Sequence, residues 1–505
     1  MMNYSKKIVA LYSVIALIVS SCNDTKKEGA DDTKKETKQL VAKVIETPKR
    51  PNILLVLCDD LGYADVGFNG SKDIKTPALD ALALTGTKLT SAYVPHPFCG
   101  PSRAGIMTGR YAHTIGAQFN LPPNSETISK GIDVGETFMS KVLQESGYST
   151  GLVGKWHLGA VDKYHPNNRG FDDFYGFLGG GHNYHPADYK AKYAVAKAKG
   201  TKVIWDYLSP LEHNGKEVVD DNEYLTDVLS NQGVRFIQEY SKKDAPFFLF
   251  MSYNAPHTPL EAKKEDLEMF SNIEDKNRRT YAAMVHAVDR GVGKMVEALK
   301  TTGEYENTLI IFFSDNGGKL SKGANNFPLK EGKGSVYEGG FRIPMFFHWP
   351  GKVASGMIYN YPVSALDLYP TLTALANANS KIPADKVLTG KNIWDGFLMN
   401  KEVKQGDYIF TMRHRTGFSD VGVRSGKWKA VKANDQKWEL FNIEEDIEES
   451  NDISANHPKI LKKLILEAEA WSKTHIQPKW WHNKKTGEEW TKDKMPHFEK
   501  TFSID

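Results

Sequence analysis

The chain has 505 residues, which is enough for one large domain and a smaller one. Its 65 basic and 62 acidic residues leave a formal net charge of +3, which gives no reason to expect a nucleic-acid partner, so any recognition of anions must be local. The chain has only three cysteines, which excludes a disulfide framework.

The N-terminus has the pattern of a secretory signal. Basic residues precede an apolar run over residues 8–19 that is too short to span a bilayer. Residues 19–22, Val-Ser-Ser-Cys, resemble a bacterial lipobox, which predicts a signal peptide over 1–21 and a lipid on Cys22; an ordinary signal peptide with a chance cysteine is the alternative. Residues 22–49 are too polar to fold and predict a tether. We therefore expect a lipoprotein of the bacterial cell envelope, anchored in a membrane such as the outer membrane and facing the periplasm or the surface.

Apolar runs and amphipathic stretches alternate from residue 50 onward. Three runs lack polar alternation and predict strands buried on both faces, at 52–58, 247–253 and 308–314. Amphipathic stretches predict helices over 77–84 with Thr76 as N-cap, 135–146, 222–240 and 276–300. This order predicts an α/β fold with a large, mostly parallel central sheet flanked by helices, in which ligands bind at the carboxyl ends of strands.

The composition changes after about residue 390, where tryptophan and charged residues become frequent. Residues 422–431 and 438–442 predict antiparallel strands, and a helix is predicted at 458–473. We therefore expect a main domain over 50–390 and a smaller C-terminal subdomain over 391–505.

Acidic and amide residues follow two of the predicted strands. Asp59 and Asp60 follow the first strand, and Asp315 and Asn316 follow the third. Three carboxylates and one amide oxygen at the same edge of a sheet suit a hard divalent cation such as calcium or magnesium. Because Asp-Asn-Gly-Gly is also an ordinary turn, this pattern alone leaves the metal site open.

The most specific motif is Pro-Phe-Cys-Gly-Pro-Ser-Arg-Ala-Gly-Ile-Met-Thr-Gly-Arg at residues 97–110, a polar loop that leads into a predicted short helix. Its Cys-x-Pro-Ser-Arg spacing, from Cys99 to Arg103, arises by chance at a rate on the order of one in a thousand for a chain of this length. On this motif, the sequence resembles the type I, formylglycine-dependent sulfatases of the alkaline phosphatase superfamily over roughly residues 50–452.

The resemblance implies a nucleophile and a metal. In this family a formylglycine-generating maturation enzyme oxidises the motif cysteine, here Cys99, to formylglycine (3-oxoalanine). One hydroxyl of the hydrate attacks sulfur, and the other allows the sulfated intermediate to collapse and expel sulfate. The family's usual ion is calcium, so the resemblance implies one Ca²⁺ held by Asp59, Asp60, Asp315, Asn316 and the modified residue 99. An unmodified loop cysteine is the alternative.

Further motifs supply the other catalytic positions. The resemblance is carried by Gly-Lys-Trp-His, which contains Lys155 and His157, and by Gly-Lys-Gly-x-x-x-Glu-Gly-Gly-x-Arg-x-Pro, which contains Lys333. It implies that Lys155 and Lys333 bind sulfate oxygens and that Arg103 and His157 contact the formylglycine. His257 follows a predicted strand, where it can protonate the departing sugar oxygen, although an isolated histidine is more often structural.

An enzyme of this kind on a lipid tether would meet sulfated polysaccharides or their oligosaccharides. We prefer an algal polymer such as ulvan, carrageenan or fucoidan, and animal glycosaminoglycans also fit. Aromatic side chains can stack on sugars and basic ones can bind anions, so the candidate substrate contacts are His182, Tyr184, His185, Arg413 and His414. For each of them, loop packing or surface charge is the alternative.

Two other functions stay open at this stage. A phosphonate monoester hydrolase or phosphodiesterase would use the same formylglycine motif and metal site on phosphorus. A non-catalytic surface protein that binds sulfated glycans would require Cys99 to remain a thiol.

Overall fold

The computed structural model describes residues 49–123, 128–201, 206–219, 222–492 and 498–503. The predicted signal peptide, the lipid site at Cys22 and nearly all of the tether lie outside these residues and stay predictions. Within the described part of the chain, no helix has both the length and the apolar character needed to cross a membrane.

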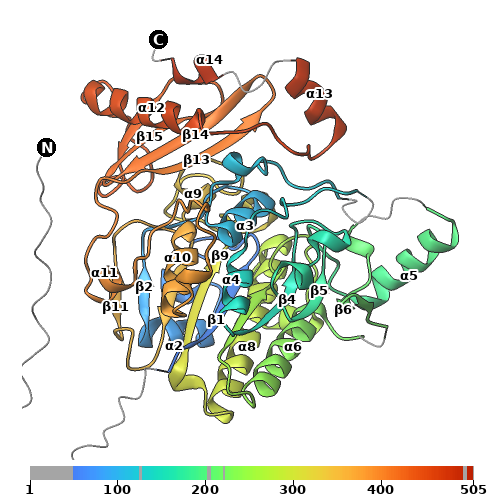
Figure 1. Ribbon diagram of the computed structural model, residues 1–505. Helices are drawn as coiled ribbons and strands as arrows, with labels where there is room; N and C mark the ends of the chain where they lie inside the picture. Colours follow the sequence, from blue (N-terminus) through green and yellow to red (C-terminus); the bar gives the residue numbers. More distant parts are fainter. Residues whose placement is uncertain (1–48, 124–127, 202–205, 220–221, 493–497, 504–505) are drawn as a thin grey trace, which may run out of the picture. The chain divides into compact units, whose positions relative to one another are not determined.

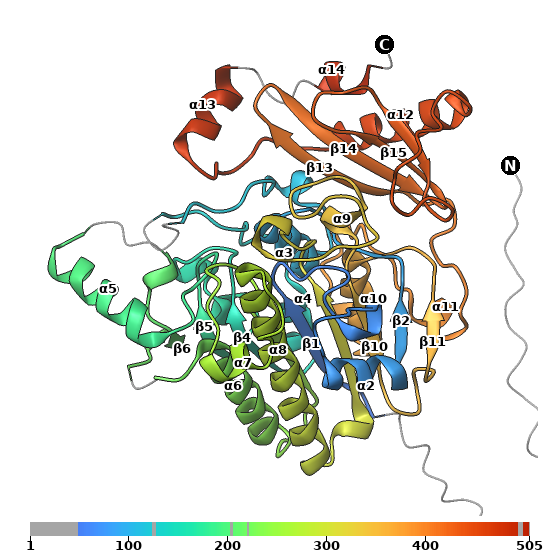
Figure 2. The ribbon, with the colours of Figure 1, turned by 180° about the vertical axis from the view of Figure 1, so that it is seen from behind.

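A mixed, mostly parallel sheet of ten strands forms the centre of the fold (Figures 1 and 2). Its strands are β1 Asn52–Cys58, β2 Thr87–Leu89, β4 Ser149–Lys155, β5 Asp173–Phe177, β6 Glu212–His213, β7 Lys216–Glu217, β8 Phe247–Ser252, β9 Thr308–Ser314, β10 Met345–His348 and β11 Met357–Tyr359. Their order is β11-β2-β10-β9-β1-β8-β4-β5-β6-β7. The five strands from β9 to β5 run parallel, whereas β10 is antiparallel to both of its neighbours. A separate pair consists of β3 Ala92–Tyr93 and β12 Val363–Ser364.

Helices cover both faces of the large sheet, which confirms the predicted fold class. One face is covered by α2 Pro77–Thr85, α6 Leu225–Tyr240 and α8 Lys276–Thr301, and the other by α3 Cys99–Thr108, α4 Met139–Glu145 and α10 Leu368–Leu375. Side chains of β1 alternate between the two cores: Leu54 and Val56 pack toward α8, and Ile53 and Leu55 toward α3. The shorter helices are α5 Pro186–Ala198, α7 Lys264–Glu268, α9 Glu338–Phe341 and α11 Trp394–Leu398.

The local predictions differ in accuracy. The strands predicted at 52–58 and 308–314 are correct to the residue, but the helix predicted from residue 135 begins at Met139. Thr76 is the N-cap residue of α2, as predicted, but its side chain makes no capping hydrogen bond. Its hydroxyl accepts a hydrogen bond from the Gly67 amide at 2.8 Å and donates one to Asp80 at 2.9 Å, so it ties α2 to the preceding loop.

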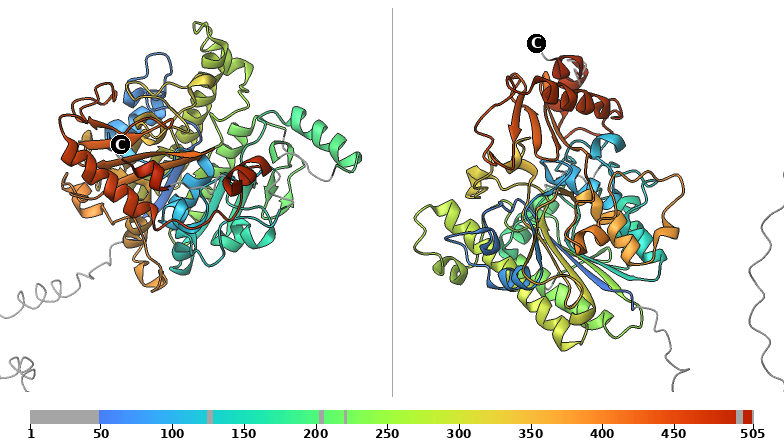
Figure 3. Two further views of the ribbon diagram at one scale, coloured as in Figure 1. Left: turned by 90° about the horizontal axis from the view of Figure 1, so that it is seen from above. Right: turned by 90° about the vertical axis from the view of Figure 1, so that its left-hand side faces the viewer.

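A second sheet of four antiparallel strands follows, as the sequence predicts (Figure 3). It contains β13 Ile409–Arg415, β14 Phe418–Ser425, β15 Trp428–Lys432 and β16 Glu439–Asn442. The helices that follow it are α12 Pro458–Ser472, α13 Lys484–Lys492 and α14 Phe498–Phe502. Leu464 and Trp471 of α12 pack against Met412 and Val423 of the sheet. The domain boundary near residue 390 stays a prediction.

A buried charge network joins the C-terminal sheet to α9 and β3 of the main domain. The ammonium of Lys429, in β15, forms ion pairs with Glu338 at 2.9 Å and with Glu449 at 2.7 Å, and all three side chains are fully buried. Glu338 also accepts hydrogen bonds from Tyr93 at 2.6 Å and Arg342 at 3.0 Å. Burial raises the pKa of Glu449 to about 7, although Lys429 acts to lower it.

The raised pKa of Glu449 predicts a pH-dependent stability. The unfolded chain releases this proton near the ordinary value of 4.5, whereas the folded chain keeps it up to about 7. The folded state therefore binds more protons between these values, and the free energy of unfolding should fall as the pH rises through the window. We expect the free energy of unfolding of Glu449→Gln, which cannot ionise at this position, to decrease less over this pH window. Urea unfolding at several pH values measures this decrease. Equal decreases for the two proteins would contradict this assignment.

Candidate active site

Two adjacent strand ends bring three carboxylates together. Because β1 and β9 are parallel neighbours in register, the residues that follow them start side by side. The Asp60 amide donates to Asp315 Oδ1 at 3.4 Å, and Asn316 Nδ2 donates to Asp60 Oδ1 at 2.7 Å. Among the described residues, Asp59 Oδ1 and Asn316 Oδ1 are buried without a hydrogen-bond partner. Such orphaned oxygens are costly, and this all-oxygen donor set fits a hard divalent cation.

Three cations lie against the same carboxylates. Each pairs with a different one: Lys155 Nζ with Asp59 at 2.5 Å, Arg103 Nε with Asp315 at 2.7 Å, and Lys333 Nζ with Asp60 at 2.5 Å. Arg103 Nη2 also lies 4.0 Å from Asp59, so a single guanidinium spans both strand ends. The structure therefore brings together the predicted metal ligands and three of the predicted catalytic residues.

Asp59 and Asp315 have opposite pKa shifts. Burial alone would raise the pKa of Asp59, but Lys155, followed by His257 and Arg103, holds it well below its usual value. Burial and the charge of Asp59 raise the pKa of Asp315 to about 6, despite the neighbouring Arg103. The protein cations thus stabilise the charge of Asp59 but not fully that of Asp315, and a divalent cation would supply further positive charge.

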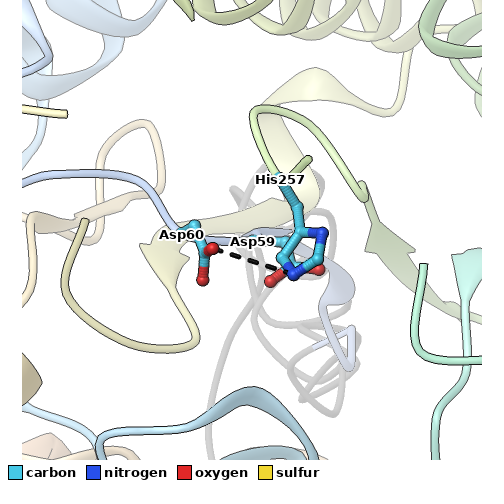
Figure 4. Close-up of side chains that lie close together, drawn as sticks. All are labelled: Asp59, Asp60 and His257. Atoms are coloured by element: carbon cyan, nitrogen blue, oxygen red, sulfur yellow. Dashed lines mark ion pairs between the residues drawn. The ribbon is translucent and has the colours of Figure 1, made fainter. Parts of the chain in front are cut away.

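His257 faces the same cluster (Figure 4). Its Nε2 lies 3.8 Å from Asp60 Oδ2, and one ligand atom from each of Asp59, Asp60 and His257 lies within 4.8 Å of the others. The ring is oriented by Nδ1, which donates to the Thr258 carbonyl at 2.7 Å. Burial lowers the pKa of His257, and Asp59 opposes this shift. The geometry thus allows His257 a second role, as a metal ligand, which its sequence context does not predict.

Cys99 is the first residue of α3 and is only 2% exposed, so it does not lie in an open loop as its sequence context predicts. Its Sγ lies 3.8 Å from Asn120 Oδ1. Burial raises the pKa of the Cys99 thiol, although Lys155 and Lys333 act to lower it. Because the thiolate is the reactive form of cysteine, an unmodified Cys99 would be a weak nucleophile at neutral pH.

A cavity of about 270 Å³ opens onto Cys99, and we call it the Cys99 cavity. Residues that line it include Cys99, Asn120, His157, Gly180, Tyr207, His257, Lys333 and His482. Asn120, Tyr207 and His482 were missed from the sequence, because each stands in a segment without a recognisable motif. Asn120 also accepts a hydrogen bond from the Gly100 amide at 2.9 Å, so it fixes the start of α3.

His157 adopts a strained backbone conformation two residues after the end of β4. Its φ of 64° lies in the left-handed region, which is uncommon for residues other than glycine and often occurs at functional sites. A Cβ placed on Gly180 would lie 2.8 Å from His157 Nε2, so only glycine leaves room for the ring in this position. Burial and the nearby Lys155 lower the pKa of His157, which favours the neutral imidazole that a proton acceptor requires.

The candidate substrate contacts separate into two groups. His182 is fully buried, and its two ring nitrogens contact the carbonyls of Asn183 and Ser209. The hydroxyl of the fully buried Tyr184 donates to backbone carbonyls at 254 and 257. Neither residue lines the Cys99 cavity. Tyr184 supports the segment that carries His257, whereas the His182 ring holds the backbone at Asn183 and Ser209.

The other three candidate contacts, His185, Arg413 and His414, lie in different places. His185 lies against the Tyr224 ring and also does not line the Cys99 cavity. Arg413 and His414 line a neighbouring cavity that shares Asn120 and His482 with it, so these two residues stay candidates for substrate contact.

Most of the chain is similar to known protein families. A family model described as "Sulfatase" matches residues 51–378, and one described as "N-sulphoglucosamine sulphohydrolase, C-terminal" matches residues 332–472. Mouse arylsulfatase J is 31% identical over 497 residues, covering 87% of this chain and 80% of that protein. Human N-acetylgalactosamine-6-sulfatase is 32% identical over 365 residues, covering 70% of this chain and 67% of that protein.

Solved structures give a further comparison. The crystal structure of Ps i-CgsB in complex with k-i-k-neocarrahexaose has 55% sequence identity and a TM-score of 0.88, covering 90% of this chain and 100% of that chain. PsFucS1 sulfatase from Pseudoalteromonas sp. has 25% identity and a TM-score of 0.71, covering 88% of this chain and 95% of that chain.

The carboxylate cluster predicts a measurable metal affinity. Asp315→Asn keeps the shape of the side chain but removes one anionic ligand, so we expect calcium to bind at least about tenfold more weakly in titration calorimetry. Asp435→Asn is the matched control, because Asp435 is paired with Lys500 in a different part of the chain. Equal calcium affinities for Asp315→Asn and the unaltered protein would contradict the metal assignment.

The close approach of Gly180 to His157 predicts that a side chain at residue 180 would displace the His157 ring. Gly180→Ala should displace the His157 ring and lower kcat/KM by about tenfold or more, because small misplacements of catalytic groups are costly. Gly293→Ala is the control, since a Cβ there would meet its nearest neighbour, Ala78, at an ordinary 3.4 Å. Full activity of the Gly180 variant, measured beside this control, would show that the histidine position is not critical.

Proposed function

The chain belongs to the sulfatase family and is a sulfuric ester hydrolase, and from this premise we propose that it removes sulfate from a carrageenan-type galactan or its oligosaccharides. We further propose that residue 99 acts as formylglycine and that the metal is calcium. The family generally uses formylglycine and a divalent metal, and the residues described above fit both groups.

The observation that carries the proposal is the position of Cys99. Its side chain shares one cavity with Lys333, His157 and His257, and both Lys333 and His257 lie against the carboxylate of Asp60. The raised pKa of Cys99 makes direct attack by the thiolate unfavourable, which supports oxidation of this residue before catalysis.

Formylglycine and the divalent cation would each supply a defined part of the chemistry. Formylglycine supplies, as its hydrate, an attacking hydroxyl and a second hydroxyl through which sulfate is released. A divalent cation, when bound by Asp59, Asp60, Asp315 and Asn316, supplies positive charge next to the sulfuryl oxygens.

The remaining steps are assigned to side chains of this protein. Lys155 and Lys333 stabilise the negative charge on the sulfuryl oxygens, and Arg103 orients the oxygens of residue 99. His157 is neutral and can accept the proton of the attacking hydroxyl. His257 can deliver a proton to the sugar oxygen as the S–O bond breaks, because its Nε2 faces the cluster.

The substrate class is proposed from the structural relative. Ps i-CgsB was solved in complex with a neocarrahexaose, and this chain is 55% identical to it over 90% of its length. Carrageenan also belongs to the algal polymers that the sequence analysis favours. The identity of the sulfated hydroxyl is left to experiment.

The test is sulfate release by protein co-expressed with a formylglycine-generating enzyme. We expect release from carrageenan oligosaccharides when residue 99 carries the aldehyde, which mass spectrometry detects, and none from Cys99→Ala. Cys99→Ser should stop after one turnover, because a serine sulfate lacks the second hydroxyl.

Other outcomes would contradict the proposal in different ways. Cleavage of phosphonate monoesters or phosphodiesters instead of sulfate esters would assign the chain to phosphorus chemistry. Full activity of Cys99→Ala would exclude residue 99 as the nucleophile.

A further inference from the structure

A second cavity adjoins the Cys99 cavity and is strongly basic. It has a volume of about 270 Å³, and its charged lining residues are Lys319, Lys333, Arg413, Arg415 and Glu331. Four of these are cations and one is an anion, and we call this space the basic cavity. Lys333 lines both cavities, so a ligand of the basic cavity lies next to the site of hydrolysis.

The two arginines come from one strand of the C-terminal sheet. Arg413 and Arg415 are two positions apart in β13, so their side chains project from the same face. Arg413 donates to the Gly334 carbonyl at 2.8 Å, and its guanidinium lies 4.9 Å from the centre of the Phe98 ring. The segments beside both cavities therefore hold this arginine in place, as expected for a preorganised anion site.

The sequence permits this close approach at Gly334. Its φ of +86° is a conformation that favours glycine, and an added Cβ would lie 2.8 Å from Phe98 and 3.0 Å from Arg413 Nη1. The residue directly before it is Lys333, which binds Asp60. One short segment thus connects the arginine to the carboxylate cluster.

The charges of the two arginines are incompletely compensated. Arg415 forms an ion pair with Asp420 through Nε, whereas no acidic side chain among the described residues forms an ion pair with Arg413. Burial and the nearby Arg415 lower the pKa of Arg413, and Asp420 and Glu331 oppose this shift only in part. An anionic group between them would provide that compensation.

We propose that the basic cavity is a second sulfate-binding subsite, in which Arg413 and Arg415 bind a sulfate on a neighbouring sugar while the target sulfate occupies the Cys99 cavity. This inference rests on the proposed function, because it requires a sulfated oligosaccharide as substrate. It assigns the arginines to recognition of a multiply sulfated segment and adds Arg415 to the substrate contacts.

A third cavity gives the sugar chain a place to lie. Arg413 and Arg415 also line this space, together with the aromatic residues Phe98, Phe119 and Trp490. Aromatic faces stack on sugar rings, and basic side chains between them bind the attached sulfates. β13 lies near α3 and α9 in both ribbon views, so the C-terminal sheet lies on the same side of the central sheet as the segment that begins with Cys99 (Figures 1 and 2).

The experiment is a binding titration of Cys99→Ala protein, which does not consume the ligand. Two galactan oligosaccharides of equal length are compared, one with a single sulfate and one with an additional sulfate on the adjacent sugar. We expect the doubly sulfated ligand to bind about tenfold more tightly, since a charge-assisted contact has an effect of this size. The preference should decrease at high ionic strength.

Replacement of each arginine isolates its contribution. In the Cys99→Ala background, Arg413→Gln or Arg415→Gln should abolish most of the preference, whereas Arg415→Lys should retain part of it. The lysine variant also keeps a cation beside the buried Asp420, so it is informative if Arg415→Gln folds poorly. Lys437→Gln is the control, because it removes one positive charge from an exposed position in the C-terminal subdomain and should leave the preference unchanged.

The outcomes separate this inference from the proposed function. Equal affinity for the two oligosaccharides, or arginine variants that weaken both to the same extent, would overturn the second subsite. An equal gain in affinity from a uronate in place of the second sulfate would overturn its assignment to sulfate. If the matured enzyme releases no sulfate but the inactive protein keeps its arginine-dependent preference, the proposed function fails and the subsite stands.

Discussion

The interior of the protein holds three carboxylates at the ends of two adjacent strands, and most other features of the site follow from their charge. Removing an ion from water costs several kcal/mol even after relaxation, so buried charges persist only with close partners. Here the partners come from separate elements: Arg103 from α3, Lys155 from the end of β4, and Lys333 from the segment before α9. The electrostatic requirement of the carboxylates thus brings the catalytic side chains together and also leaves a place for a divalent cation.

The C-terminal sheet contributes to stability and carries the two arginines of the proposed sulfate subsite. Its Lys429 lies between Glu338 and Glu449 in a fully buried network, and breaking such a network by removing one partner typically costs about 3–5 kcal/mol. The same sheet presents Arg413 to the cavities next to Cys99. A rigid attachment is useful here, because an arginine that selects a distant sulfate must keep its position relative to the nucleophile.

The sequence was most informative where local chemistry decides structure. Apolar runs located β1 and β9 to the residue, and the motif around Cys99 identified the family and therefore most of the site. Helix starts were less accurate: the helices predicted from residues 135 and 222 begin at Met139 and Leu225. The hydroxyl of Thr76, at the predicted N-cap of α2, bonds to the preceding loop and Asp80, which depends on the surrounding structure. His182 and Tyr184 resembled surface contacts but are buried, and Asn120, Tyr207 and His482 reach the cavity only through long-range folding.

The central claim is that the carboxylates and residue 99 surround one divalent cation. The most direct test is a crystal structure of the matured protein with calcium, in which anomalous scattering locates the ion. The account predicts a single ion about 2.3–2.6 Å from oxygens of Asp59, Asp60, Asp315 and Asn316, next to residue 99. An ion bound elsewhere, with Lys155 and Lys333 still paired to Asp59 and Asp60, would contradict it.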